Sequence, residues 1–99
     1  MKEPTPAKCS EGVHKMWQTI KFRFENFIHK NKLWGALSDD DKAEYNALRK
    51  EFVATSASML RNFEQNGSAD RERAIRQYLK EADSERVTIE SKFSNKYIE

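Results

Sequence analysis

The sequence predicts an all-α protein, an antiparallel up-down-up bundle of three long helices. Apolar residues recur at helical spacing in three separate segments. The breaks between these segments are short and lie near Gly35 and at Asn66-Gly67. Charged residues make up 34% of the chain and hydrophobic residues 37%, which is typical of amphipathic helices around a thin core. Because short connections force each helix to turn back beside the previous one, the three segments are expected to pack together.

Residues 1–9 contain both prolines and no apolar period. We therefore predict a flexible N-terminal tail over this range, ending at Ser10, which has the side chain of a helix N-cap. The remaining residues, 10–99, are too few for two cores and are expected to form a single domain.

The first helix is predicted over 11–34. At 100° per residue its large apolar side chains fall within an arc of about 120° and form one face. Gly35 follows as the predicted stop, because glycine readily adopts the backbone that ends a helix. The residues of this face are Val13, Met16, Trp17, Ile20, Phe24, Phe27 and Ile28.

The second helix is predicted from Ser38 to about Gln65. Ser38 followed three residues later by Asp41 resembles a capping box, in which each side chain bonds the other residue's amide. The acidic run 39–41 also suits the positive end of the helix dipole. The expected core face contains Tyr45, Leu48, Phe52, Met59 and Phe63, with small Thr55 and Ser56 between them.

The third helix is predicted from Ala69 nearly to the end of the chain, after a stop at Asn66-Gly67 and a cap at Ser68. Asp83-Ser84 within it could mark a kink or a fresh N-cap, so two shorter helices are an alternative. Its expected core face contains Ile75, Tyr78, Leu79, Ala82, Ile89, Phe93 and Tyr97.

Arg86 interrupts this third apolar face. Three explanations stay open. The side chain could extend to water, or it could pair with an acid such as Glu44, Glu51 or Glu90. Alternatively, the stripe leaves the bundle at this point and exposes its last residues to another chain.

The cysteine content and hydropathy indicate a cellular location. The one cysteine, Cys9, excludes an intramolecular disulfide. No apolar run approaches the 7–15 residues of a signal-peptide core or the roughly 20 residues of a membrane span. We therefore expect an intracellular protein, cytoplasmic or nuclear, with no membrane partner.

No pattern typical of catalysis is present. His14 and His29 lie fifteen residues apart on one helix, which separates them by about 22 Å. Consecutive carboxylates at 39–41 point 100° apart and do not converge on a cation. The three glycines are scattered and form no phosphate-binding loop. The expectation is a protein without catalytic residues, metal, cofactor or small-molecule substrate.

The outer face of the first helix is the leading candidate surface. Phe22 and Leu33 point almost opposite the core stripe, alongside Lys15 and His29. Two large apolar groups with basic neighbours suit a contact with another protein or with a second copy of the chain. Simple exposure, or coverage by the tail, is the alternative. The leading hypothesis is a non-catalytic helical protein-interaction module, and self-association is one form that the contact could take.

The same helix is basic, which supports a second hypothesis. Residues 1–37 carry seven Lys or Arg against three Glu, whereas residues 38–67 carry four against six acids. Lys21, Arg23, Lys30 and Lys32 could contact the phosphates of a nucleic acid. The aromatic rings among them belong mostly to the core stripe, so a protein partner is preferred.

The segment 34–45, Trp-Gly-Ala-Leu-Ser-Asp-Asp-Asp-Lys-Ala-Glu-Tyr, resembles the junction between the second and third helices of HMG-box DNA-bending domains. In that family a Trp, a Leu-Ser start, a Lys and a Tyr recur at this spacing, so the resemblance implies DNA binding. It covers twelve residues. The preceding segment is shorter than the family's first two helices. Arg49 and Ser56 stand where a small residue and a second tyrosine are expected.

Overall fold

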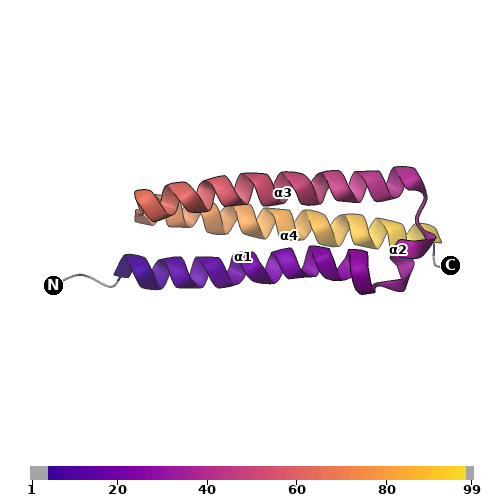
Figure 1. Cartoon of the computed structure of the whole chain (residues 1–99), viewed down its shortest axis with the longest axis horizontal. Coiled ribbons are helices and arrows are strands. Elements are labelled where there is room, and N and C mark those ends of the chain that lie inside the picture. Colours follow the sequence, from indigo (N-terminus) through magenta and orange to yellow (C-terminus); the bar gives the residue numbers. More distant parts are fainter. Residues whose placement is uncertain (1–4, 98–99) are drawn as a thin grey trace.

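The computed structural model describes the backbone of residues 5–97 and the side chains of residues 11–97, and every regular element in this range is a helix. The elements are α1 (Thr5–Lys30), α2 (Lys32–Ala36), α3 (Asp39–Gln65) and α4 (Ala69–Tyr97). The three long helices lie side by side in a body measuring 58 × 18 × 17 Å, and the short α2 lies at one end (Figure 1). The all-α prediction is confirmed, with four helices in place of three.

The first helix begins earlier than predicted. α1 starts at Thr5, so residues 5–9 of the expected tail are helical and Ser10 is not the N-cap. Pro6 is compatible with this start, because the first amides of a helix have no intrahelical acceptor and a proline there costs no hydrogen bond. The rest of the predicted tail, residues 1–4, lies outside the described residues.

The first helix also ends earlier than predicted, at Lys30 and not at Trp34. Asn31 has extended backbone angles, and its Oδ1 accepts a hydrogen bond from the amide of Leu33 at 2.8 Å. Asparagine is a preferred N-cap residue, so Asn31 starts the separate helix α2. Gly35 lies within α2 and has no positive φ. The expected glycine stop is therefore wrong.

The start of α3 matches the prediction, but its cap differs. The hydroxyl of Ser38 accepts from the amide of Asp41 at 3.1 Å, as in a capping box. The carboxylate of Asp41 accepts from the hydroxyl of Tyr97 at 2.6 Å and from Lys96 Nζ at 3.0 Å. Tyr97 also accepts from the Ser38 amide at 2.9 Å. These bonds fasten the first turn of α3 to the last turn of α4.

This junction predicts a pH dependence of stability. The hydrogen bond from Tyr97, followed by that from Lys96, holds the pKa of Asp41 below its usual value. A carboxylate with a lowered folded-state pKa contributes stability above its unfolded pKa, about 3.9, and loses it as the pH falls through the folded value. The Asp41→Asn variant should therefore be less stable than wild type at pH 7, and this difference should shrink on acidification. Urea unfolding between pH 7 and pH 2.5 measures it. A difference that stays constant with pH would contradict the assignment.

Helix α4 is continuous from Ala69 to Tyr97, so the two-helix alternative with a break at Asp83-Ser84 is wrong. Its start is capped as predicted, because the Ser68 hydroxyl accepts from the amide of Arg71 at 3.1 Å. Beyond the predicted break, Ile89 is 8% exposed and Phe93 is fully buried. The last part of the apolar stripe therefore packs within its own chain.

Aromatic rings from the three long helices fill the core. The Phe24 ring lies 5.2 Å from that of Phe52 and 5.6 Å from that of Tyr45, measured between ring centroids. The Phe52 ring also stacks on Tyr78 at 6.3 Å. Trp17 joins this core from α1, and its Nε1 donates to the buried hydroxyl of Ser56 at 2.6 Å. Aromatic side chains that were predicted on three separate apolar helix faces therefore pack together in one hydrophobic core.

Candidate functional site

The outer face of α1 carries one large exposed aromatic side chain. Phe22 is 64% exposed, whereas Phe24, two residues later, is fully buried. Lys15 and His29 lie seven residues before and after Phe22, and both are exposed. Because seven residues are close to two helical turns, the three side chains share one ridge. The structure thus places three of the four predicted protein-interaction residues together.

Leu33, the fourth residue, is not part of this ridge. It is 9% exposed and belongs to the hydrophobic core. The prediction that it lies beside Phe22 assumed one uninterrupted helix to Trp34. Because α1 ends at Lys30 and Asn31 restarts the chain as α2, Leu33 turns inward. Its assignment to an interaction surface is wrong.

The basic residues around this ridge differ in their surroundings. Lys21 Nζ lies 4.3 Å from the ring centroid of Trp17. Arg23 donates to Asp83 at 3.0 Å. Lys15, Lys30 and Lys32 are exposed and make no ion pair with any described side chain. Lys32 lies on α2, so of these three only Lys15 and Lys30 remain on α1 with Phe22.

A groove between α3 and α4 is a second surface feature, and sequence reasoning missed it. Its volume is about 470 Å³. Leu48 and the buried Ile89 supply apolar lining, and Glu44 pairs with Lys92 at 3.0 Å. The lining residues are Glu44, Ala47, Leu48, Glu51, Ser84, Glu85, Thr88, Ile89 and Lys92. The groove therefore combines apolar surface with three carboxylates and one ammonium group.

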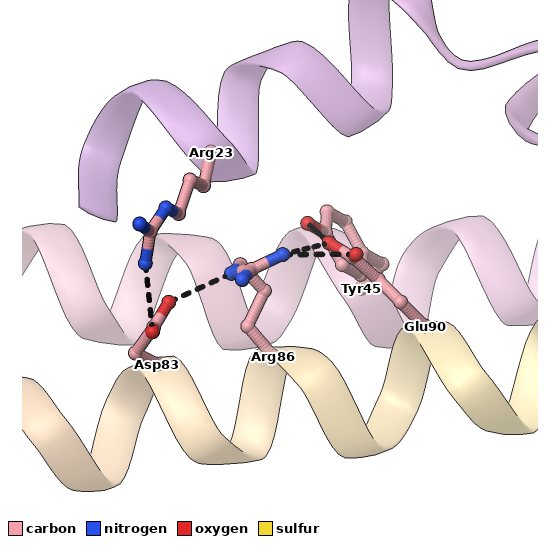
Figure 2. Close-up of polar contacts among 5 residues, drawn as sticks. All are labelled: Arg23, Tyr45, Asp83, Arg86 and Glu90. Carbon is pink, nitrogen blue, oxygen red and sulfur yellow. Dashed lines mark hydrogen bonds and ion pairs between the residues drawn. The ribbon is translucent and has the colours of Figure 1, made fainter. Parts of the chain in front are cut away.

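A partly buried charged cluster around Arg86 lies between α1, α3 and α4 (Figure 2). Arg86 Nη1 donates to both carboxylate oxygens of Glu90 at 2.9 Å, and its Nε donates to Asp83 at 3.0 Å. The hydroxyl of Tyr45 donates to Glu90 at 2.7 Å. Asp83 lies between Arg86 and Arg23 and accepts from both. Of the three explanations left open for Arg86, the structure shows pairing with an acid, and of the three named acids the partner is Glu90.

The electrostatics of this cluster favour fixed charges. Burial lowers the pKa of Arg86, but its hydrogen bonds to Glu90 and Asp83 outweigh burial and raise the pKa above the usual arginine value. Burial, followed by the hydrogen bond to Glu90, raises the pKa of Tyr45 far above the tyrosine range. Efficient proton transfer needs a pKa near the working pH. The pKa values of Arg86 and Tyr45 are both shifted away from neutral pH, so these side chains are suited to holding the three long helices together.

The sequence contained a signal for this cluster. Asp83 and Glu90 lie three residues before and four residues after Arg86, which are the spacings at which helical side chains meet. Asp83-Ser84 is also compatible with a kink or a fresh N-cap, and that alternative concealed the pairing of Asp83 with Arg86. The basic residue inside the apolar stripe and its two flanking acids together indicate an ion cluster.

The HMG-box-like segment 34–45 contains the end of α2, the connection to α3 and the first residues of α3. Trp34 packs against Tyr45 with 5.7 Å between ring centroids, and Leu37 is 5% exposed. Three residues that carry the resemblance therefore pack into this chain's own core. That packing accounts for their spacing without a nucleic acid.

Within residues 11–97, no three His, Cys, Asp or Glu side chains converge as a metal site would require. No helix in the described part of the chain is both long enough and apolar enough to cross a membrane.

Comparison of the chain with protein-family models, curated proteins and solved structures finds no match.

Proposed function

We propose that this chain is a non-catalytic protein-interaction module, with the outer face of α1 as its contact surface. Its framework is an antiparallel up-down-up bundle of the three long helices. The observation that carries the proposal is the 64% exposure of Phe22 on a helix whose other phenylalanines, Phe24 and Phe27, are at most 3% exposed. The partner is another protein or a second copy of this chain.

The energetics of an exposed aromatic support a protein partner. Burying a phenylalanine side chain stabilises a complex by about 1.5–3 kcal/mol. Binding surfaces often place one aromatic at the centre of a polar rim, where the rim excludes water from the contact. Phe22 has such a rim, because Lys15, Asn26 and His29 on the same helix are exposed.

The ion contacts favour protein over nucleic acid. Arg23 is paired with Asp83 and Lys21 lies over Trp17, so two of the four predicted phosphate-binding side chains already have contacts within the chain. Lys30 and Lys32 lie on different helices.

The single cysteine also fits an intracellular, reducing location.

The test compares two exposed apolar side chains on different helices. Phe22→Ser is expected to abolish binding of the proteins that copurify with the tagged chain. Val87→Ser, on α4, should retain them, because Val87 is 48% exposed but lies outside the α1 face. Quantitative affinity purification with light scattering measures both partner binding and self-association. Equal retention by the two variants would overturn the proposal.

A nucleic-acid titration is the companion measurement. Binding to duplex or single-stranded oligonucleotides at about 50 mM salt, weakening steeply by about 200 mM, would indicate phosphate contacts. If that binding is lost when Lys30 and Lys32 are changed to glutamate and is unaffected by Phe22→Ser, the nucleic-acid hypothesis replaces the protein-interaction proposal.

A further inference from the structure

We propose that the groove between α3 and α4 binds the outer face of α1 from a second copy of the chain, so that molecules associate head to tail. This inference rests on the proposed function, since it uses the same α1 face and names its partner. The composition of the groove, the matching charge of α1 and the separation of the two surfaces support it.

The groove has an apolar lining with uncompensated negative charge beside it. Leu48 and Ile89 contribute the apolar surface. Glu51 on α3 and Glu85 on α4 lie on its two sides, and both are exposed. Among the described residues neither carboxylate forms an ion pair.

The two carboxylates also act on a common neighbour. Burial raises the pKa of Tyr78, a hydrogen bond with Thr55 opposes this, and the negative charges of Glu51 and Glu85 add to the rise. Both carboxylates line the groove between α3 and α4. A ligand that brings a cation and an apolar group to this groove would pair with these carboxylates and cover its apolar lining.

The outer face of α1 carries both an apolar group and cations. Phe22 is its exposed apolar group, and the ammonium groups of Lys15 and Lys30 make no ion pair with described side chains. Lys15 and Phe22 are seven residues apart, as are Glu44 and Glu51 in the groove. On a helix this separation is about 10 Å, so the part of the α1 face from Lys15 to Phe22 has a length similar to that of the groove.

A second copy is favoured as the occupant because one chain carries both complementary surfaces. Residues 1–37 have four more basic than acidic residues, and residues 38–67 have two more acidic than basic residues. No groove residue belongs to α1. Each molecule can therefore bind one neighbour through α1 and another through its groove, and such head-to-tail contacts produce rings or open chains instead of a closed dimer.

The contact should be weak and sensitive to salt. The groove lining spans residues 44–51 and 84–92, which is only about 12 Å of each helix. Contacts below roughly 1,200 Å² are typical of transient association. Exposed ion pairs are screened over about 10 Å at 0.1 M salt, so association should decrease as the salt concentration increases.

Sedimentation velocity on the full chain, at concentrations up to about 1 mM and at low and high salt, tests the inference. The wild type is expected to form species larger than a dimer at low salt. The α1-face variant, Phe22→Ser with Lys15→Glu, should be monomeric. The groove variant, Glu51→Lys with Glu85→Lys, should also be monomeric. Val87→Ser should associate like wild type, and circular dichroism confirms that each variant is folded.

Mixing the two monomeric variants gives the decisive measurement. The groove variant retains an intact α1 face and the α1-face variant retains an intact groove, so an equimolar mixture should form a 1:1 dimer and nothing larger. A mixture that stays monomeric overturns the inference. A wild-type dimer that is lost with the α1-face variant but unchanged in the groove variant also overturns it, in favour of symmetric α1–α1 contact.

Failure of this inference can be distinguished from failure of the proposed function. A wild-type chain that stays monomeric at every concentration and salt overturns head-to-tail association. The comparison of Phe22→Ser with Val87→Ser in binding other proteins would still give its own result. Only equal retention in that comparison removes the α1 face as a contact surface.

Discussion

Replacing Arg86 with methionine is expected to lower the free energy of unfolding by about 1.5–3 kcal/mol, because it removes charged hydrogen bonds from a partly buried ion cluster. The Arg86 side chain is 12% exposed, and those of Glu90 and Asp83 are 21% and 25% exposed. Without the guanidinium, Tyr45 is the one remaining hydrogen-bond partner of Glu90 among the described side chains. A partly buried carboxylate then lacks the cation that offsets its desolvation.

A double-mutant cycle with Glu90 separates this charge effect from loss of packing. Arg86→Met with Glu90→Met removes both charges, and replacing a buried pair with apolar groups of similar volume is often nearly neutral. The double variant should therefore be more stable than the sum of the two single changes predicts. Urea unfolding monitored by circular dichroism measures all four proteins. Additive effects, or an Arg86→Met variant within about 0.5 kcal/mol of wild type, would show that water satisfies these groups.

Helix positions were predictable where a local pattern decides them. The apolar stripes placed Phe24, Phe52 and Phe93 in the core, and all three are at most 1% exposed. Ser38 and Ser68 were predicted as N-caps, and both hydroxyls accept the expected amide hydrogen bonds. These features depend on residues within one or two turns of each other, so a single segment of sequence contains the necessary information.

The errors arose where two local signals competed. Asn31 and Gly35 are both residue types common at helix boundaries, Asn31 through its side chain and Gly35 through its backbone freedom, and the sequence pattern does not rank them. The structure ends α1 before Asn31 and leaves Gly35 inside α2. Four residues of extra helix in the prediction were enough to place Leu33 on the wrong side of the chain.

The candidate surface was predictable only in part for the same reason. Phe22 lies well inside α1, so its angle from the core stripe determines its exposure. The lining of the α3–α4 groove depends on the register of two packed helices, because the residues that face each other in it are about 40 positions apart in the sequence. Leu48 and Ile89 meet in it only because the helices pack side by side. A single-helix pattern contains no information about that register.

Phe24→Ala is the second change expected to have a large effect, and Phe22→Ala is its matched control on the same helix. Truncating a fully buried phenylalanine costs about 3–5 kcal/mol, because apolar burial is lost and a cavity remains. Phe24 is fully buried, with ring centroids of Phe52 and Tyr45 at 5.2 and 5.6 Å.

Both substitutions remove the same atoms and change the intrinsic helix propensity equally, so the difference between them measures tertiary packing alone. Phe22 is 64% exposed, and its truncation should change the free energy of unfolding by no more than about 0.5 kcal/mol. Urea unfolding of the two variants, at a protein concentration where the wild type is monomeric, measures this difference. Similar losses for both variants would mean that α1 does not bury the Phe24 face, and the interior shared by the three long helices would have to be assigned to other residues.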